Sequence, residues 1–329
     1  MVEPFFMLWE YSVILGMEKN CPYTFLFTFL SIGTLFGPVF LSAQEIKIFT
    51  RTDFDLKGEV KSCLVITDYG REEYDFAPNG LLVKSVTRYN DTDSDISSYK
   101  YNNDHLTENR VENYRNGKLD KTTSLIHIYT IDSTATKKIS ETIFSYNKEF
   151  MGRYEYQYDS INRLIKIKQV DNEGIDETRI EYSIDKGETT QTYFLNDMVQ
   201  KSIRISFKKD KNNTENRTEL TKEYLNGEAT IAIEKVFGPG NKILSREKFN
   251  FDAEAKKFVS QELWVYNYDD AGMITQLKTK TPKTESIKKY IYQFDDGDNG
   301  NWIKKIITPE NSYITRRIQY YTAENIDGK

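Results

Sequence analysis

Few residues of this sequence could do acid, base or nucleophilic chemistry. It has only two histidines, His105 and His127, and Cys63 is the one thiol after residue 44. General acid–base catalysis needs a side chain that titrates near neutral pH, most often histidine. We expect His105 in a turn and His127 within a strand, and no Gly-x-Ser-x-Gly motif accompanies them. The sequence therefore predicts no catalytic residues and a protein that is not an enzyme.

Cys63 lies in the apolar segment SCLVIT and is interpreted as a small buried strand residue. A reactive thiol is less favoured, because no histidine or cluster of cations stands nearby in the sequence to lower its pKa. A single thiol cannot form an internal disulfide, and one cysteine with two histidines is too few for a structural zinc site. We expect no cofactor.

Acidic turns are the remaining candidates for a bound cation. Asp91, Asp93 and Asp95 alternate like the first ligands of an EF-hand loop, and Asp296 and Asp298 follow Asp295 in the run DDGDNGN. Ile96 and Asn102 replace the glycine and the glutamate that an EF-hand requires. Because Asp and Asn populate turns for backbone reasons alone, a solvated turn is the favoured interpretation of both runs, and no metal is expected.

The first 44 residues differ from the rest. Residues 24–43 carry no charge and end in Leu41-Ser42-Ala43. We interpret residues 17–43 as a signal peptide and residues 1–16 as a mis-assigned upstream extension. An uncleaved anchor is the alternative, since about 20 apolar residues can span a bilayer. No cysteine follows the apolar run, so no lipobox is expected; the predicted location is periplasm, outer-membrane surface or medium, with no membrane span after cleavage.

The predicted mature chain, residues 44–329, is nearly balanced in charge. Removal of residues 1–43 takes away Lys19, Glu3, Glu10 and Glu18, which leaves 44 basic and 47 acidic residues and a net charge of −3. Proteins that bind nucleic acid normally present a basic face, so nucleic acid is not an expected partner. Tyr 23 and Phe 19 against Pro 7 indicate a folded chain rich in residues that suit strands.

A unit of about 25 residues recurs along the mature chain. It begins with aromatic residues at every second position, continues through a turn with Asp, Asn or Gly, and returns as an apolar and basic run, as in YEYQYDSINRLIKIKQ at 154–169. Strand side chains alternate between two faces, so the rings lie on one face of a hairpin. The repeat aromatics are Tyr74, Phe76, Tyr99, Tyr101, Tyr154, Tyr156, Tyr158, Trp264, Tyr266, Tyr268, Tyr290, Tyr292, Phe294 and Trp302, and the repeat turn residues are Asn79, Gly80, Asp159, Asn162, Asp269, Gly272, Asp295 and Gly300.

No helical period of 3.6 accompanies this pattern. The sequence predicts one all-β domain over residues 44–329, a repeat architecture of antiparallel hairpins in a curved or spiralling sheet that is open or barrel-like. Residues 176–248 form its degenerate centre, with a long solvated loop expected at 208–219. Lys166, Lys168, Lys304 and Lys305 are expected at solvated sheet edges, where lysine resists edge pairing.

The Tyr-x-Tyr-Asp signature and the ending FDDGDNGNWIKKI…ITRRIQYY resemble the tyrosine–aspartate (YD) repeats of the Rhs family and of short secreted bacterial YD-repeat proteins. The resemblance covers 74–114, 154–169 and 264–321 most strongly. It implies a spiralling sheet of hairpins. The chain departs from large Rhs proteins in its length and in having no distinct C-terminal toxin-like region.

Two interpretations of the aromatic rows remain open. As core, the rings pack between hairpins; as a platform, they stack on sugars or on a partner chain. The leading hypothesis is an exported non-catalytic β-repeat protein that presents a curved sheet for binding or for cell-envelope structure, with carbohydrate or another envelope protein as partner. The alternatives are an Rhs-like encapsulating or toxin-associated component, and an enzyme acting on envelope polysaccharide through two turn carboxylates.

Overall fold

The computed structural model describes residues 47–295, 297 and 300–322. They form one antiparallel sheet of 20 strands in which each strand pairs with the next along the chain. The strands are β1 (Val60–Thr67), β2 (Gly70–Phe76), β3 (Leu82–Arg88), β4 (Ser94–Asn102), β5 (His105–Arg115), β6 (Lys118–Asp132), β7 (Lys138–Ser145), β8 (Phe150–Tyr158), β9 (Leu164–Val170), β10 (Ile175–Asp185), β11 (Glu188–Leu195), β12 (Met198–Lys209), β13 (Glu215–Leu225), β14 (Glu228–Phe237), β15 (Ile243–Asp252), β16 (Lys257–Tyr268), β17 (Ile274–Lys280), β18 (Glu285–Phe294), β19 (Trp302–Thr308) and β20 (Ser312–Tyr320). The all-β hairpin prediction is confirmed.

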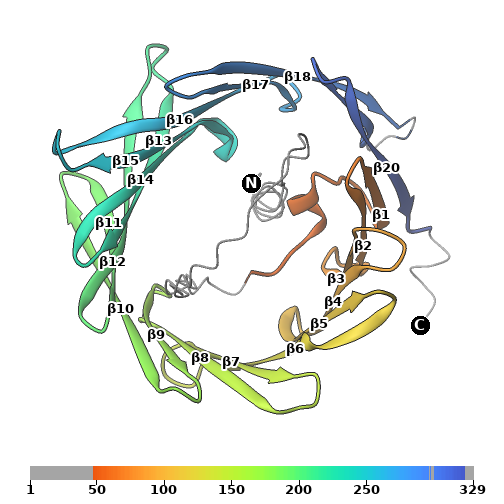
Figure 1. Cartoon of the computed structure of the whole chain (residues 1–329), viewed down its shortest axis with the longest axis horizontal. Helices are drawn as coiled ribbons and strands as arrows, with labels where there is room; N and C mark the ends of the chain where they lie inside the picture. The colour runs from red at the N-terminus through yellow and green to blue at the C-terminus, as the bar shows by residue number, and fades with distance from the viewer. Residues whose placement is uncertain (1–46, 296, 298–299, 323–329) are drawn as a thin grey trace, which may run out of the picture.

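The sheet closes on itself, which the sequence left open. β1 pairs antiparallel with β20, with Cys63 opposite Ile318 and Val65 opposite Arg316, so the last strand returns to the first and the chain forms a β-barrel (Figure 1). Closure removes the unpaired sheet edges through which β-proteins aggregate. The expectation that four lysines guard sheet edges is therefore wrong: Lys166, Lys168, Lys304 and Lys305 all lie in paired strands.

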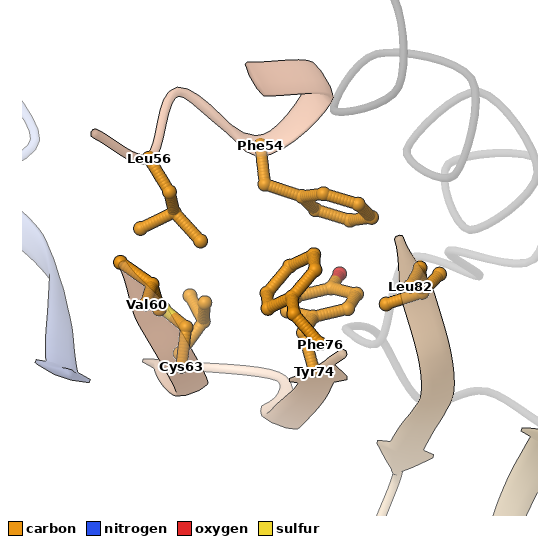
Figure 2. Packing of buried hydrophobic residues seen from close by; sticks show 8 residues of the cluster. Phe54, Leu56, Val60, Cys63, Tyr74, Phe76 and Leu82 are labelled. Carbon is orange, nitrogen blue, oxygen red and sulfur yellow. The ribbon is translucent and has the colours of Figure 1, made fainter. Parts of the chain in front are cut away.

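A short segment, residues 47–59, lies inside the ring against β1, β2 and β3 (Figure 1). It contains the 3-10 helix η1 (Arg51–Phe54). Phe54 and Leu56 point from this inner segment onto Val60, Cys63, Tyr74, Phe76 and Leu82 of the strands (Figure 2). The Phe54 ring lies 4.3 Å from the Tyr74 ring, centroid to centroid. The face of the sheet that carries Tyr74 is therefore the inner face.

Hydrogen bonds attach the inner segment to both sides of the seam between β1 and β20. Arg51, 7% exposed, donates to the carbonyl oxygens of Ala77 and Pro78 in the turn after β2. At the other end, Asn301 accepts from the peptide N of Lys57 at 2.8 Å and donates to its carbonyl oxygen at 2.9 Å. Asn301 is 1% exposed, and a buried amide satisfied on both its groups holds its partner firmly.

The repeated unit has the turn geometry that the sequence predicts. Asp159 accepts from the peptide N of Asn162 through its carbonyl, and its carboxylate accepts from the peptide N of Arg163 at 2.8 Å. Asp269 makes the same contacts with Gly272 and Met273. Asn162 has φ 61° and Gly272 has φ 83°, so both occupy the left-handed position of the turn.

A β-bulge follows most of these turns, and it falls at the last aromatic residue before the turn. Gln157 pairs with Lys166, but Tyr158 pairs with Leu164, so Ile165 has no residue directly opposite. The same shift occurs at Phe76, Tyr101, Phe144, Phe194, Tyr224, Phe237, Tyr268 and Phe294. Bulges increase local twist, which helps a sheet curve and close.

The degenerate centre, residues 176–248, is as regular in structure as the rest. β10 to β14 continue the hairpin sequence, and the expected long loop at 208–219 is wrong. Only residues 210–214 form the turn there, where Asn213 has φ 61° and donates its peptide N–H to the carbonyl of Asp210. Lys208 and Lys209 instead pair with Asn216 and Glu215 in the ladder between β12 and β13.

Candidate functional site

The inner face can be traced around the whole ring, because residues directly opposite each other in an antiparallel pair share a face. Starting from Tyr74, the pairings lead to Ser85, Ser97, Val111 and Leu125. Tyr182, Gln191, Ile203, Thr221, Ile233 and Lys248 form a second such row further round the ring. The row through Tyr292, Lys305 and Ile314 approaches the seam on the same face.

All the repeat aromatics of the sequence lie on this inner face, but they are not equally covered. Tyr74, Phe76, Tyr156, Tyr158, Tyr266 and Trp302 are buried. Tyr99, Tyr101, Tyr154, Trp264, Tyr268, Tyr290 and Tyr292 are partly buried, and Phe294 is 41% exposed. The buried rings pack as core, whereas the others keep part of their surface exposed, because the wall is a single layer and, within the described residues, only the inner segment 47–59 lies over it.

Several tyrosine hydroxyls tie one hairpin to its neighbour. Tyr101 donates to the carbonyl oxygen of Leu82 at 2.7 Å, and Tyr268 donates to that of Ile243, also at 2.7 Å. Each acceptor is the first residue of the preceding returning strand, next to a bulge. These hydroxyls satisfy backbone groups that the irregular pairing leaves available, so the rings also act as links between repeats.

Cations lie over the inner rings in the second half of the barrel. The Lys201 ammonium is 4.3 Å from the Tyr193 ring centroid, the Arg217 guanidinium 4.0 Å from that of Phe237, and the Arg246 guanidinium 4.7 Å from that of Trp264. Contacts below about 6 Å between a cation and an aromatic face are attractive. The inner wall thus presents rings and positive charge side by side.

Lys305 and Arg316 lie together against Trp302, and Arg316 is buried there. The Arg316 guanidinium lies 3.5 Å from the Trp302 ring centroid, and its Nη2 donates to the Phe54 carbonyl oxygen at 3.0 Å. Its Nε and Nη1 groups have no hydrogen-bond partner among the described residues. Burial, together with the neighbouring Arg316 charge, lowers the pKa of Lys305 to about 8, against the opposing effect of Asp55.

A polar cluster stands on the opposite part of the inner wall. The Glu141 carboxylate lies 2.8 Å from His127 Nδ1 and accepts hydrogen bonds from the hydroxyls of Tyr129 and Tyr156, each at 3.0 Å. Burial alone would raise the pKa of Glu141, but the contacts with His127 and the two tyrosines outweigh it and keep that pKa below its ordinary value. Burial and the Glu141 charge raise the pKa of both tyrosines.

The other residues considered for chemistry are separate from one another. His105 is exposed at the start of β5, whereas His127 lies in β6 on the inner face. Cys63 is buried in β1, as predicted, and burial raises the pKa of its thiol to about 11. A thiol with a raised pKa is poorly nucleophilic at neutral pH.

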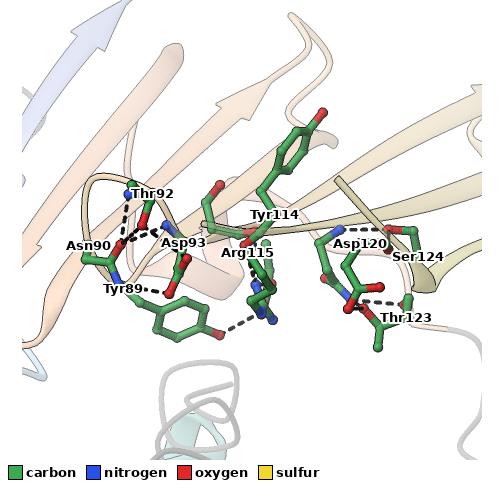
Figure 3. Close-up of polar contacts among 12 residues, drawn as sticks. Tyr89, Asn90, Thr92, Asp93, Tyr114, Arg115, Asp120, Thr123 and Ser124 are labelled. Carbon is green, nitrogen blue, oxygen red and sulfur yellow. Dashed lines mark hydrogen bonds and ion pairs between the residues drawn. The ribbon is translucent and has the colours of Figure 1, made fainter. Parts of the chain in front are cut away.

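The acidic run 91–95, at the start of β4, accepts hydrogen bonds from backbone and side-chain donors of neighbouring turns and strands (Figure 3). Asp93 accepts from the peptide N of Asn116 at 2.7 Å and from the side chain of Asn90 at 3.0 Å, and these contacts hold the pKa of Asp93 below its usual value. Asp95 accepts from Arg115 and from the Tyr89 hydroxyl. Asp91 is exposed, and Asp296 and Asp298 lie outside the described residues. Among the residues described, no group of three or more acidic, histidine or cysteine side chains is placed to hold a metal ion.

The sequence alone did not point to the inner cations of the second half. Lys201, Arg217 and Arg246 were not singled out, because the centre of the chain departs most from the repeat pattern. The sequence does show their alternation along the strands. Lys201, Ile203 and Ile205 share one face of β12, and Arg246 and Lys248 share one face of β15. Assigning that face to the inside requires the strand pairings.

Comparison with known proteins gives no family. No protein-family model and no curated protein matches the chain. Among solved structures, a porin-like protein from Bacteroides uniformis matches at 10% identity and a TM-score of 0.33, covering 79% of this chain and 96% of that one. A porin-like protein from Bacteroides vulgatus matches at 9% identity and a TM-score of 0.24, covering 80% and 98%. Both TM-scores lie below 0.5, so neither likeness bears on the function of this chain.

Proposed function

We propose that this chain is an exported, non-catalytic β-barrel that binds a carbohydrate chain along its aromatic inner face. One observation carries the proposal: the rows of tyrosine and tryptophan that define the repeat all face inward in a wall one sheet thick. A core between two layers would cover such rings on both sides. Here Trp264, Tyr290 and Tyr292 remain partly exposed.

The chemistry between the rings suits a sugar chain. The apolar C–H faces of sugars stack on aromatic rings, and their hydroxyls need hydrogen-bond partners. Side chains of Thr189, Gln191, Thr221, Thr279 and Ser286 alternate with the rings on the inner face. A wall of this kind binds through many weak contacts.

The outer face favours an aqueous surrounding. Charged pairs occupy outward positions along the strands, such as Lys166 with Glu177 at 2.8 Å and Lys278 with Glu285 at 2.8 Å. A barrel that crosses an outer membrane needs an apolar outer belt about 25 Å tall. No helix in the described part of the chain is long and apolar enough to cross a membrane. Export rests on the leader-like residues 17–43, which lie outside the described residues.

Closure of the sheet favours a second candidate, an Rhs-like encapsulating component, because a closed wall can surround a cargo. That candidate rests on the YD-repeat resemblance. It predicts a polypeptide that stays bound during purification from the native host and is released only on unfolding, together with neighbouring secretion, toxin or immunity genes. A barrel that purifies without such a polypeptide counts against it.

Intrinsic fluorescence offers a direct test of carbohydrate binding. The sequence has three tryptophans, Trp9, Trp264 and Trp302, and the last two lie on the inner face. In the full chain carrying Trp9→Phe, a bound oligosaccharide should shift the emission and reduce quenching by acrylamide. A panel of neutral and acidic oligosaccharides that leaves the emission unchanged would rule the proposal out. Shortening of the oligosaccharide, followed by mass spectrometry, would show an enzyme instead.

A further inference from the structure

The inner wall from β12 to β20 is positively charged. Arg217 pairs with Glu219 at 3.1 Å and Lys288 with Glu310 at 3.0 Å, but basic side chains remain in excess on this face. Its inward-facing basic residues are Lys201, Lys209, Arg217, Lys235, Arg246, Lys248, Lys257, Lys288, Lys305 and Arg316, and its inward-facing acidic residues are Glu215, Glu219, Glu223, Asp252 and Glu262. The chain as a whole has a net charge of −5, so this excess of cations is local to one surface.

Like charges are brought together twice on this wall. Lys235 lies directly opposite Arg246 in the ladder between β14 and β15. Lys305 and Arg316 lie over the same Trp302 ring, at 5.2 Å and 3.5 Å from its centroid. Like charges that face each other across strands destabilise a sheet.

Glu219 lies opposite Lys235 in the neighbouring ladder, and Glu262 lies opposite Lys248, so acids offset part of this repulsion. The cations still outnumber the acids on this face, and an anion that binds between them would reduce the repulsion that remains.

The rings set the orientation of these cations. The Arg246 guanidinium lies over the Trp264 ring and the Lys201 ammonium over the Tyr193 ring, so each positive group is next to an aromatic surface. A ligand that reaches them must carry negative charge and an apolar face at the same time. Sugars bearing carboxylates have both, because the carboxylate accepts hydrogen bonds from the cation while the ring stacks beside it.

From this placement we infer that the inner face of β12–β20 binds an acidic polysaccharide whose sugars carry carboxylates. The inference rests on the proposed function and names its ligand class. Single-stranded nucleic acid also combines stacking with negative charge, but it carries a phosphate on every nucleotide. Glu219, Glu223 and Glu262 stand among the cations on the same face and would repel so dense a charge. A chain with sparser charge and many hydroxyls fits this wall better.

The test compares two double variants of the full chain, each in the Trp9→Phe background. Arg246→Gln with Lys248→Gln removes two inner cations of β15. Arg204→Gln with Lys278→Gln removes one arginine and one lysine from the outer face of the same half, where they pair with Glu188 and Glu285. The change in net charge is identical, so only its location differs. If the double variant in β15 has a lowered melting temperature, Lys201→Gln on β12 serves as an independent inner variant.

The probes are an oligogalacturonate, a neutral malto-oligosaccharide of equal length and a single-stranded DNA of equal charge. We expect oligogalacturonate to bind most tightly of the three probes. The inner double variant Arg246→Gln with Lys248→Gln should weaken its affinity tenfold or more. The outer double variant Arg204→Gln with Lys278→Gln should change that affinity less than twofold. Added salt should weaken oligogalacturonate binding and leave any neutral binding unchanged. The inner pair should reduce that salt dependence.

The outcomes separate the two proposals. Equal effects of the inner and outer pairs, or equal affinity for the acidic and neutral chains, overturn the charge inference while the proposed carbohydrate function stands. Tighter binding of the DNA overturns the ligand class. Failure of both oligosaccharides to change the fluorescence of Trp264 and Trp302 overturns the charge inference and the proposed function together.

Discussion

The two halves of the inner wall are built from the same hairpin unit but differ in what stands between the rings. From β1 to β11 the inward positions beside the aromatics carry small or neutral groups, such as Ser85, Ser97 and Asn109, together with the carboxylates Glu72, Asp95 and Glu141. Lys137 and Arg163, which lie over inner rings in this half, come from turns and not from the strands. From β12 to β20 lysine and arginine take the equivalent positions. The rings and turns therefore specify the barrel, and the positions between them are free to specify what it binds.

Removing a buried aromatic ring should cause the largest loss in the free energy of unfolding. This loss should be similar in the two halves. Tyr156 in β8 is 3% exposed and Tyr266 in β16 is 6% exposed. Replacing either with alanine leaves a cavity, and we expect a loss of about 3–4 kcal/mol in the free energy of unfolding, measured by urea denaturation. Tyr156→Phe and Tyr266→Phe keep the ring and should cost about 1 kcal/mol or less.

A small loss for one alanine variant and a large loss for the other would show that the halves do not share one framework. In that case the aromatic rows of the tolerant half would be a surface without a structural role. The comparison between halves would then concern packing as well as charge.

Local chemistry explains which parts of this fold the sequence could predict. Alternating rings and a positive-φ residue three places after Asp159 or Asp269 are short-range signals, so hairpins and turns were predicted correctly. Closure depends on the pairing of Val65 with Arg316 across almost the whole chain, and no local pattern encodes it. The position of the inner segment 47–59 likewise depends on contacts with distant residues such as Asn301.

The candidate site was predicted in part for the same reason. The rings were found because they repeat, and the strand position of His127 followed from its apolar neighbours. The lysines were placed at edges that the closed sheet does not have. Lys304 and Lys305 are adjacent in sequence, yet Lys304 pairs with Gln293 on the outer face and Lys305 with Tyr292 on the inner face.

The next largest effect on the free energy of unfolding should come from Lys305, and it should be a gain in stability. Its neighbour Lys304 should show no such effect. Burial lowers the pKa of Lys305 to about 8 in the folded protein, below its value in the unfolded chain. Below pH 8 the folded state must hold this charge at a cost, so Lys305→Met should stabilise the protein at pH 7 by about 2 kcal/mol.

The pH dependence gives the check. Above pH 8 the folded protein releases the proton while the unfolded chain keeps it, so the wild type gains stability and its deficit against Lys305→Met should shrink up to about pH 10. Lys304→Met on the outer face should change the stability little at any pH. A destabilised Lys305→Met variant at pH 7 would mean that the inner charge is not strained in the empty barrel.

Substitutions at the turns should cause a smaller loss in the free energy of unfolding. This loss should again be equal in the two halves. Gly272 has φ 83° and Asn162 has φ 61° at equivalent positions. Valine disfavours positive φ, so Gly272→Val and Asn162→Val should each lower the free energy of unfolding by about 1 kcal/mol or more. Gly272→Asn should be nearly neutral, because asparagine already occupies this position at 162. Unchanged melting temperatures for both valine variants would refute the shared turn.

The smallest change in the free energy of unfolding should come from substitution of Glu141. This prediction concerns the first half of the wall alone. The pKa of Glu141 lies below its ordinary value in the folded protein, so the ionised carboxylate stabilises the fold above the unfolded pKa of about 4.3, and this contribution is lost as pH falls through the folded value. Glu141→Gln keeps the shape but loses the charge that His127, Tyr129 and Tyr156 contact, and we expect a cost of about 1 kcal/mol at pH 7. The difference in the free energy of unfolding between Glu141→Gln and wild type should narrow below pH 4 in urea denaturation.

If Glu141→Gln weakens oligogalacturonate binding as much as the inner double variant Arg246→Gln with Lys248→Gln, ligand contacts extend over both halves. The division of the wall by charge then does not define the site.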